Sequence, residues 1–367
     1  MSDPEINVHA LDAAYKPFPR FVDWASNTSV DTVRWNRYNS AFSAKPNASN
    51  RALRRAHEIV KRAAALDTGA IEGLYEVDRG FTFTVALETA AWEVKLAEKG
   101  AQVRPLFEAQ LHAYDYVLDL ATKAEPISEA AIRTLHEVVC KAQQTYRVMT
   151  AIGPQEQELV KGRYKVLPNH VRTRDGSNHS YAPVDATPSE MQRLVEEMRS
   201  EAFVASHPVT QAAYAHHGLV VIHPFADGNG RVARALASAF TYRAIAMPIM
   251  ILSDQKNPYL NSLEAADRGE YQAFVDFILA RTLDTIKLAQ ESFLSAAVPS
   301  ADEAAAAIED LFITRGGYTQ QQVDAAGNQL NQLFFDTFSR IVTTMRGKNL
   351  SGNVRSIPTQ ERGPDPG

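Results

Sequence analysis

The sequence has very little cysteine: Cys140 is the only thiol among 367 residues. A lone thiol cannot close an internal disulfide, and it excludes a metal cluster built from cysteines. Long apolar runs are also missing, because no uncharged stretch of about 20 apolar residues is present to cross a bilayer. The first residues, Met1 to Glu5, lack the basic and apolar regions of a signal peptide. These absences predict a cytoplasmic protein without a membrane span.

A surplus of basic charge is lacking as well. Lys and Arg total 38 residues against 43 of Asp and Glu, a net charge of -5, and the two signs are interspersed. A general basic surface for nucleic acid is therefore not expected, although a local phosphate site stays open. The apolar content of 45% allows a substantial core, in two or three domains or in one domain with extensions.

Helical periodicity is the main signal that is present, and it predicts an all-α fold. Ser128 is expected to cap one helix, and Thr187 to Glu190 form a capping box that opens another, running to about Ala205. Apolar residues at helical spacing predict further helices over about 50–66, 83–99, 103–123, 211–222, 230–245 and 271–293.

One stretch, from about 162 to 185, has a different pattern. It carries β-branched and aromatic residues around a proline and an Asp175-Gly176 turn, which predicts a small irregular β-hairpin. The tail is rich in Gly, Pro, Ser and charge, and it predicts disorder. The expected organisation is an N-terminal helical region over 1–100, a central domain over 101–290, a C-terminal helical region over 291–346 and a disordered tail over 347–367.

The twelve residues "HPFADGNGRVAR", 223 to 234, carry the densest set of chemically capable side chains. Gly228, Gly230 and Ala233 fit a loose dinucleotide fingerprint, but five residues separate the preceding apolar run from the first glycine where that fold needs a tight turn. A calcium loop starting at Asp227 fails, because its twelfth position is Ser238 rather than a bidentate glutamate.

A third interpretation is a helix, a short loop and a second helix, with the loop binding polyphosphate. Gly228 and Gly230 let the backbone approach an anion, and the amides at the start of the second helix point their partial positive charge at it. Arg231 and Arg234 lie three residues apart, where their guanidinium groups can hold phosphate oxygens.

Two further side chains could take part in a reaction at the bound phosphate. Asp227 is an acid among phosphate donors, which makes sense if it holds Mg²⁺, an ion that binds one or two carboxylates together with water and phosphates. His223 can act near neutral pH as a general base on a hydroxyl nucleophile. A base, a metal ligand and an anion cradle together indicate phosphoryl or nucleotidyl transfer.

The stretch resembles the signature of Fic (Fido) proteins, H-x-F-x-D/E-G-N-G-R-x-x-R, and it fills every fixed position. The resemblance implies a Fic-type helical bundle with a small β-hairpin flap and N- and C-terminal helical extensions. It also implies transfer of AMP from ATP to a Ser, Thr or Tyr hydroxyl of a target protein. The implied roles are His223 as general base, Phe225 as core anchor, Asp227 as Mg²⁺ ligand, Gly228 and Gly230 as anion hole, Asn229 and Arg231 as phosphate contacts, and Arg234 as holder of the γ-phosphate.

A second motif lies far upstream. "TGAIEG", Thr68 to Gly73, is similar to the family's inhibitory motif, [S/T]-x-x-x-E-[G/N], although the pattern alone also fits a helix start. The resemblance implies that Glu72 pairs with Arg234. A carboxylate on the γ-phosphate's arginine would occupy that ligand and repel the anion, so ATP would bind unproductively.

The resemblance leaves other positions open. Tyr259 could pack on adenine or in the core. In the expected flap, Lys165 and Arg172 could contact phosphate or target, or be ordinary surface charges. We interpret His216 as structural.

Two alternative functions remain beside the AMP transferase. Glu72 could position a water that removes AMP from a modified protein, or the site could sense nucleotide without catalysis. Partners are expected to be a target protein with an acceptor hydroxyl, with self-modification possible and nucleic acid not expected.

Overall fold

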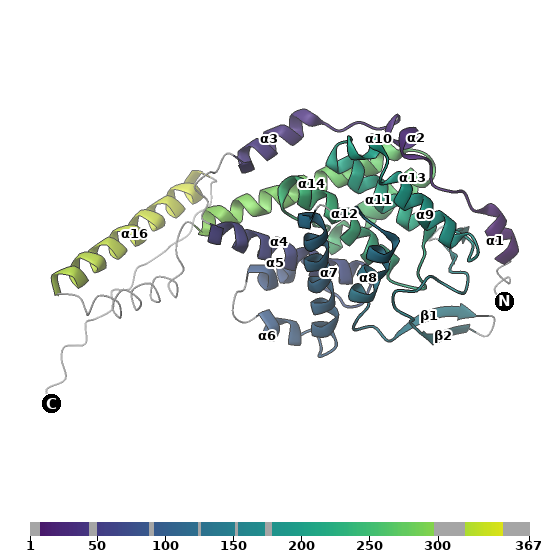
Figure 1. Ribbon diagram of the computed structural model, residues 1–367. Coiled ribbons are helices and arrows are strands. Elements are labelled where there is room, and N and C mark those ends of the chain that lie inside the picture. The colour runs from purple at the N-terminus through teal and green to yellow at the C-terminus, as the bar shows by residue number, and fades with distance from the viewer. Residues whose placement is uncertain are drawn as a thin grey trace. The chain divides into compact units, whose positions relative to one another are not determined.

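The structure is a computed structural model that describes residues 8–43, 50–87, 92–123, 126–150, 153–172, 178–296 and 320–347. The chain divides into two compact units, which join between Val298 and Pro299. The first unit is built from helices and two short hairpins (Figure 1). Its helices are α1 (Val8–Ala14), α2 (Phe21–Ala25), α3 (Thr32–Ser43), α4 (Asn50–Ile71), α5 (Arg79–Leu87), α6 (Trp92–Ala97), α7 (Val103–Lys123), α8 (Glu129–Val139), α9 (Thr187–Glu197), α10 (Glu201–Val204), α11 (Pro208–Ile222), α12 (Asn229–Ile245), the 3₁₀ helix η1 (Ser253–Gln255), α13 (Lys256–Asp267) and α14 (Tyr271–Ala296).

The all-α prediction is confirmed, and most of the expected helices are present with changed ends. The stretch predicted as one helix over 83–99 is described as two, α5 and α6. Ser128 caps α8, because its hydroxyl accepts a hydrogen bond from the amide of Ala131 at 3.1 Å. The predicted capping box is wrong. Ala186 is the N-cap residue of α9, and the hydroxyl of Thr187 donates to the carbonyl of Pro183 at 2.8 Å. The helix expected to reach Ala205 instead stops after Glu197, and a new N-cap at Ser200 starts α10.

Helices α11 and α12 form the centre of the first unit. They pack against each other, and α4, α7, α8, α9 and α14 pack around them (Figure 1). Helix α11 is apolar on nearly all sides, which is typical of a helix surrounded by others. Alanines on α12 let its neighbours approach closely. The loop that joins these two buried helices is therefore held from both ends by the core.

Two antiparallel hairpins complete the unit. Strands β1 (Thr145–Thr150) and β2 (Gly153–Glu158) pair from Thr145↔Glu158 to Thr150↔Gly153, and sequence reasoning missed them. Strands β3 (Val171–Arg172) and β4 (Asn178–His179) fall within the hairpin predicted over 162–185, but each has only two residues. The Asp175-Gly176 turn lies outside the described residues.

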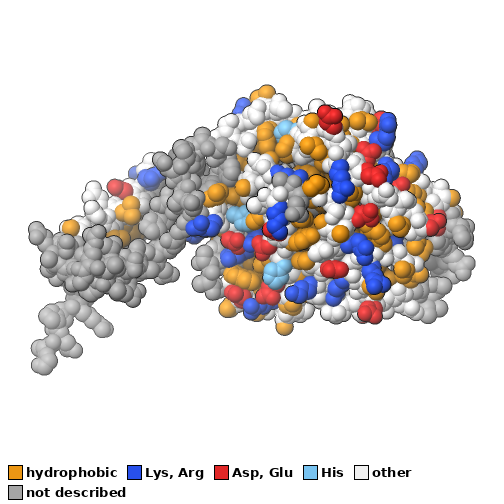
Figure 2. Space-filling view, in the orientation of Figure 1, with side chains coloured by type: hydrophobic (Ala, Val, Ile, Leu, Met, Phe, Trp, Pro, Cys, Tyr) orange, Lys and Arg blue, Asp and Glu red, His pale blue; other side chains and the backbone are white. Residues whose placement is uncertain are grey.

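The second unit is described by α16 (Gln320–Gly347) alone. The predicted tail over 347–367 lies outside the described residues beyond Gly347, which ends this helix. Among the helices that the structure describes, none is both long and apolar enough to cross a bilayer. On the face drawn in Figure 2, acidic and basic side chains are interspersed rather than gathered by sign.

Candidate functional site

The signature stretch forms the loop between α11 and α12. His223 ends α11 in the left-handed conformation, with φ 52°, and Gly228 precedes α12 with φ 81°. A Cβ atom on Gly228 would lie 2.6 Å from the Cys140 sulfur, so a side chain there would meet both an unfavourable φ and a filled space. The loop can therefore pass close to α8 only with glycine at this position.

Asn229 fixes the shape of the loop from inside. Its Oδ1 accepts from the amide of Phe225 at 2.9 Å, and its Nδ2 donates to the carbonyl of the same residue at 2.8 Å. Asn229 is 1% exposed and Phe225 is fully buried. The resemblance implied a phosphate contact for Asn229, but its side chain is engaged with the loop backbone. Phe225 occupies the anchoring place expected of it.

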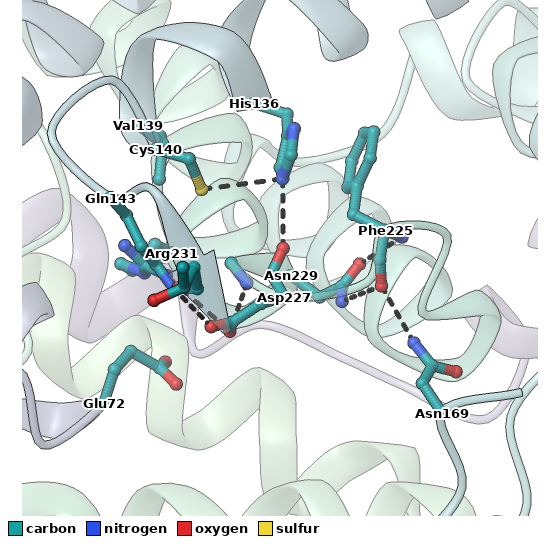
Figure 3. A network of polar contacts seen from close by, with 12 residues as sticks. Glu72, His136, Val139, Cys140, Gln143, Asn169, Phe225, Asp227, Asn229 and Arg231 are labelled. Carbon is teal, nitrogen blue, oxygen red and sulfur yellow. Dashed lines mark hydrogen bonds and ion pairs between the residues drawn. The ribbon is translucent and has the colours of Figure 1, made fainter. Parts of the chain in front are cut away.

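Two residues outside the signature hold the same loop. His136 Nδ1 accepts from the amide of Gly162 at 2.9 Å, so its Nε2–H is the donor to the carbonyl of Asp227 at 3.0 Å. Burial lowers the pKa of His136 to about 4, which keeps the ring neutral. Asn169 Nδ2 donates to the carbonyls of His223 and Phe225 at 3.1 and 2.8 Å. Figure 3 shows the contacts of His136 with Asp227 and of Asn169 with Phe225.

Gln143 joins the two charged residues of the site. Its Nε2 donates to Asp227 Oδ2 at 2.6 Å, and its Oε1 accepts from Arg231 Nη2 at 2.7 Å (Figure 3). The residue lies two positions before β1, at the foot of the unpredicted hairpin. One amide thus sets the orientation of both the carboxylate and the guanidinium. No local sequence signal marked Gln143, His136 or Asn169 as part of the site.

Arg231 is a buried cation with unused donors. It is 1% exposed, and among the described residues its Nε and Nη1 have no hydrogen-bond partner. Its ion pair with Asp227 is long, at 3.7 Å. Buried donors without partners are costly, and a charged group is costlier still. Two phosphate oxygens would satisfy these donors, so the geometry fits an anion ligand.

Arg234 is also buried, and protein groups engage all three of its guanidinium nitrogens. Its Nε donates to the hydroxyl of Thr68 at 2.7 Å, and its Nη2 donates to Glu72 Oε1 at 2.5 Å and to the carbonyl of Thr68 at 3.0 Å. Arg234 Nη1 contacts the hydroxyl of Tyr259 at 3.4 Å. The structure therefore brings the end of α4, with Thr68 in its last turn and Glu72 directly after its last residue, onto the first turns of α12.

Glu72 covers the start of α12. An added Cβ on Gly230 would lie 2.4 Å from Glu72 Oε1, so the carboxylate rests where the helix amides present their positive end. Burial alone would raise the pKa of Glu72, but the charges of Arg234, Arg231 and Lys256 hold it below its ordinary value. The carboxylate is therefore ionised, and it occupies the place where an anion would bind.

His223 has one ring nitrogen available. Its Nδ1 contacts the carbonyl of Val220 at 3.3 Å, which requires a hydrogen on Nδ1 and leaves the lone pair on Nε2. The ring of Tyr181 stacks on the imidazole, with centroids 3.8 Å apart and 17° between planes. Burial, assisted by the charge of Lys165, lowers the pKa of His223 to about 3. The imidazole is neutral at pH 7 and can accept a proton at Nε2.

A pocket of about 240 Å³ connects these groups. His223, Gly230, Arg234 and Glu72 line one part of it, and Ile71, Leu260 and Leu263 add an apolar part. Its remaining lining residues are Tyr181, Val220, Lys256 and Tyr259. A polar part and an apolar part in one pocket suit a ligand with an anionic end and a ring.

The remaining candidate residues lie in different surroundings. Tyr259 is buried beside the site, and its hydroxyl contacts Nε2 of the fully buried His216 at 2.9 Å. Lys165 is only 4% exposed and donates to Asn169 Oδ1 at 2.7 Å, so the surface-charge interpretation of Lys165 is wrong. Its ammonium supports the residue that holds the loop. The side chain of Arg172 lies outside the described residues.

Asp227 is the carboxylate that could hold a cation. Within the described ranges, no three His, Cys, Asp or Glu side chains gather into a ready-made metal site. Mg²⁺ needs no such cage, because it commonly binds one or two carboxylates, several waters and substrate phosphates. Asp227, beside the unused donors of Arg231, fits that mode of binding.

Comparison with known proteins shows that part of the chain matches a protein family. The model of the Fic/DOC family matches residues 126–241. The proteins named "Protein adenylyltransferase Fic" in Drosophila persimilis and Drosophila yakuba are both 43% identical over 98 residues, which are 27% of this chain and 19% and 20% of those proteins. The match thus spans about a fifth of the length of these curated relatives.

Solved structures agree on the fold. A Fic domain containing signaling protein from Bacteroides thetaiotaomicron aligns with a TM-score of 0.59 at 24% identity, over 71% of this chain and 96% of that one. Fic-1 from C. elegans aligns with a TM-score of 0.54 at 19% identity, over 79% of this chain and 74% of that one. Residues 126–241 thus match the Fic/DOC family model, and the helical fold is similar to that of solved Fic proteins.

Proposed function

We propose that this protein is an adenylyltransferase that moves AMP from Mg-ATP to a Ser, Thr or Tyr hydroxyl of a target protein, and that Glu72 restrains it. The observation that carries the proposal is the meeting of His223 and Arg234 in one pocket at the start of α12, with Asp227 and Arg231 beside it. The curated relatives named protein adenylyltransferase support the choice of reaction.

In this proposal the chain supplies position and charge rather than covalent chemistry. The acceptor hydroxyl lies against Nε2 of His223 and attacks the α-phosphorus of ATP. A bond forms between the hydroxyl oxygen and the α-phosphorus, the bond to the bridging oxygen breaks, and pyrophosphate leaves. The hydroxyl proton passes to Nε2. The imidazole is neutral at pH 7, so Nε2 carries the lone pair that accepts this proton.

The phosphates are held by the groups around α12. In this proposal Arg231 supplies Nε and Nη1 to phosphate oxygens, and the amides at the start of α12 add their partial positive charge. Asp227 would hold Mg²⁺, which neutralises charge on the phosphates when bound. Arg234 would hold the γ-phosphate, but only after Glu72 leaves it, because carboxylate and phosphate need the same donors.

Mass spectrometry of lysate proteins tests the proposal. The Glu72→Gly protein is incubated with lysate and a mixture of nucleoside triphosphates, and Glu72→Gly with His223→Ala serves as the matched control. We expect AMP on Ser, Thr or Tyr of a lysate protein or of the enzyme itself, and none with the control. A different added group, or equal modification by the control, would contradict the assigned reaction.

A second reaction deserves the same experiment, because Glu72 and His223 line one pocket. Glu72 could position a water that releases AMP from a modified protein. Under that alternative, Glu72→Gly loses AMP release instead of gaining transfer. A noncatalytic nucleotide sensor would bind ATP tightly and show neither reaction with any variant.

A further inference from the structure

The N-terminal segment lies along the Fic domain. We call residues 8–25, which include α1 and α2, the N-terminal strap. The hydroxyl of Tyr15 donates to Glu190 Oε2 at 3.0 Å, and the guanidinium of Arg193 lies 3.6 Å from the ring centroid of Phe18. Further along, the ring of Phe21 packs against Phe203 with centroids 5.1 Å apart. The strap is thus anchored along α9 and α10. Its α1 end lies next to the flap, the hairpin region over 162–185.

At that end the strap makes a part-buried polar contact with the flap. Asp12 Oδ1 lies 2.9 Å from Nε2 of His170, whose side chain is only 3% exposed. The other ring nitrogen, Nδ1, accepts from the backbone amide of Tyr181 at 3.1 Å. A nitrogen that accepts has no hydrogen, so Nε2–H is the donor to Asp12. The carboxylate therefore selects the tautomer that can hold the Tyr181 amide.

Tyr181 in turn contacts the proposed base. Its ring is 8% exposed and stacks on His223 at 3.8 Å, close to parallel. The imidazole is otherwise held through Nδ1 by the carbonyl of Val220. Rotation about the side-chain bonds of His223 would move Nε2 away from an acceptor hydroxyl, and the stacked ring opposes that rotation.

We propose that Asp12, His170 and Tyr181 act as positioning residues that let the N-terminal strap set the orientation of His223. The inference rests on the proposed function, because it takes His223 as the base. Without Asp12, the His170 ring can change tautomer or turn, and the Tyr181 amide loses its acceptor. Tyr181 then holds His223 less firmly, and fewer encounters place Nε2 beside the hydroxyl. ATP binding is unaffected, since the strap contacts none of the phosphate-binding residues in the described chain.

Rates of transfer test the first half of this relay. All variants are made in full-length Glu72→Gly protein, so that transfer can be measured. We expect Asp12→Ala, His170→Leu and Tyr181→Leu each to lower transfer by about tenfold, a part of the roughly 10²–10⁴-fold that a positioned base contributes. The ATP dissociation constant is expected to stay unchanged in Asp12→Ala and His170→Leu, because neither side chain lines the pocket. Tyr15→Phe is the matched control, because it removes a strap hydrogen bond that does not lead to His223.

Nuclear magnetic resonance tests the relay without requiring activity. Histidine ring protons are observed in protein labelled on histidine, and the His223 resonances are those missing from His223→Ala. The stacked Tyr181 ring shifts them upfield. We expect Tyr181→Leu to abolish that shift and Asp12→Ala and His170→Leu to reduce it. The shift is expected to persist in Tyr181→Phe, which keeps the ring, and in His170→Gln, which can still accept from the amide and donate to Asp12.

Unchanged His223 resonances in both Asp12→Ala and His170→Leu would overturn the relay, even if Tyr181→Leu has an effect. Equal losses of rate in Tyr15→Phe and Asp12→Ala would also overturn it, because they would indicate general loosening of the strap. If the Glu72→Gly parent transfers no nucleotide, the proposed function fails instead, and the resonances of His223 still decide whether the strap positions the ring.

Discussion

Glu72 and Arg234 lie 162 residues apart in the sequence, yet their side chains form an ion pair with 2.5 Å between Oε1 and Nη2. Arg234 is 3% exposed, so removing its partner would leave a buried charge uncompensated. The same donors suit a phosphate group. The pair therefore stabilises the nucleotide-free protein and, in the proposed function, opposes productive binding of ATP.

Thr68 is expected to stabilise this arrangement. Thr68→Val keeps the shape of the side chain but removes the hydroxyl that accepts from Arg234 Nε. The buried Nε–H then lacks a partner, and we expect the free energy of unfolding to fall by about 1–3 kcal/mol. Urea denaturation measures the change. Thr84→Val, which removes an exposed hydroxyl on α5, is the control and is expected to change stability little.

The effect of Gly230→Ala on stability is expected to have opposite signs in the wild-type and Glu72→Gly proteins. In the wild-type protein, Gly230→Ala places a methyl group against Glu72, and we expect it to destabilise by about 1–3 kcal/mol. In the Glu72→Gly protein the carboxylate is gone and the end of the Arg234 side chain, 3.2 Å from the added Cβ, needs to move only slightly, so alanine's helix propensity can stabilise by up to about 1 kcal/mol. A double-mutant cycle from thermal unfolding tests this. Equal effects in the two backgrounds would show that Glu72 does not lie over Gly230.

Gln143 is expected to set the Mg²⁺ requirement. Gln143→Leu frees the Asp227 carboxylate from its amide partner, and residues that orient metal ligands commonly contribute 10- to 100-fold in affinity. We expect the Mg²⁺ concentration for half-maximal transfer to rise about tenfold. Gln144→Leu is the control, because the side chain of Gln144 accepts from Lys161 instead of contacting Asp227. An unchanged Mg²⁺ requirement in Gln143→Leu would contradict the binding of Mg²⁺ by an Asp227 that Gln143 orients.

The buried Asp67 is expected to make the stability of the protein depend on pH. Burial raises its pKa from 3.8 to about 6, although the amide of Ser253 donates to it. Between about pH 4 and pH 6, the folded protein binds a proton that the unfolded chain has lost, so this contribution to stability falls as pH rises. Two pKa units correspond to roughly 3 kcal/mol. Asp67→Asn is therefore expected to raise stability at pH 8 and to change it little at pH 4, measured by denaturation at both values.

The signature was readable from the sequence because its function depends on local spacing. His223, Asp227, Arg231 and Arg234 are brought together by one loop and the first turns of one helix. Periodicity likewise predicted amphipathic helices such as α7 and α8, since their buried faces repeat along the chain. The Glu72 motif could be paired with Arg234 only through the family resemblance, because no local pattern joins α4 to α12.

What sequence reasoning missed depends on contacts between distant segments. Gln143, His136 and Asn169 meet the loop only because α8 and the flap pack beside it, and each residue type is unremarkable where it stands. The β1–β2 hairpin escaped prediction because β2, "GPQEQE", contains proline and lacks an apolar alternation. The capping box failed because Thr187 lies one position inside the helix, where its hydroxyl bonds to a preceding carbonyl.

The most direct test of the account is the transfer of label from ATP that carries radioactive phosphorus at the α position. Wild-type protein, Glu72→Gly, and Glu72→Gly combined with His223→Ala are compared at equal concentration. We expect Glu72→Gly to label protein at least about tenfold more than wild type, a difference of roughly 1.4 kcal/mol, and the double variant to give no label. Equal labelling by wild type and Glu72→Gly, or undiminished labelling by the double variant, would contradict a site restrained by Glu72 and driven by His223.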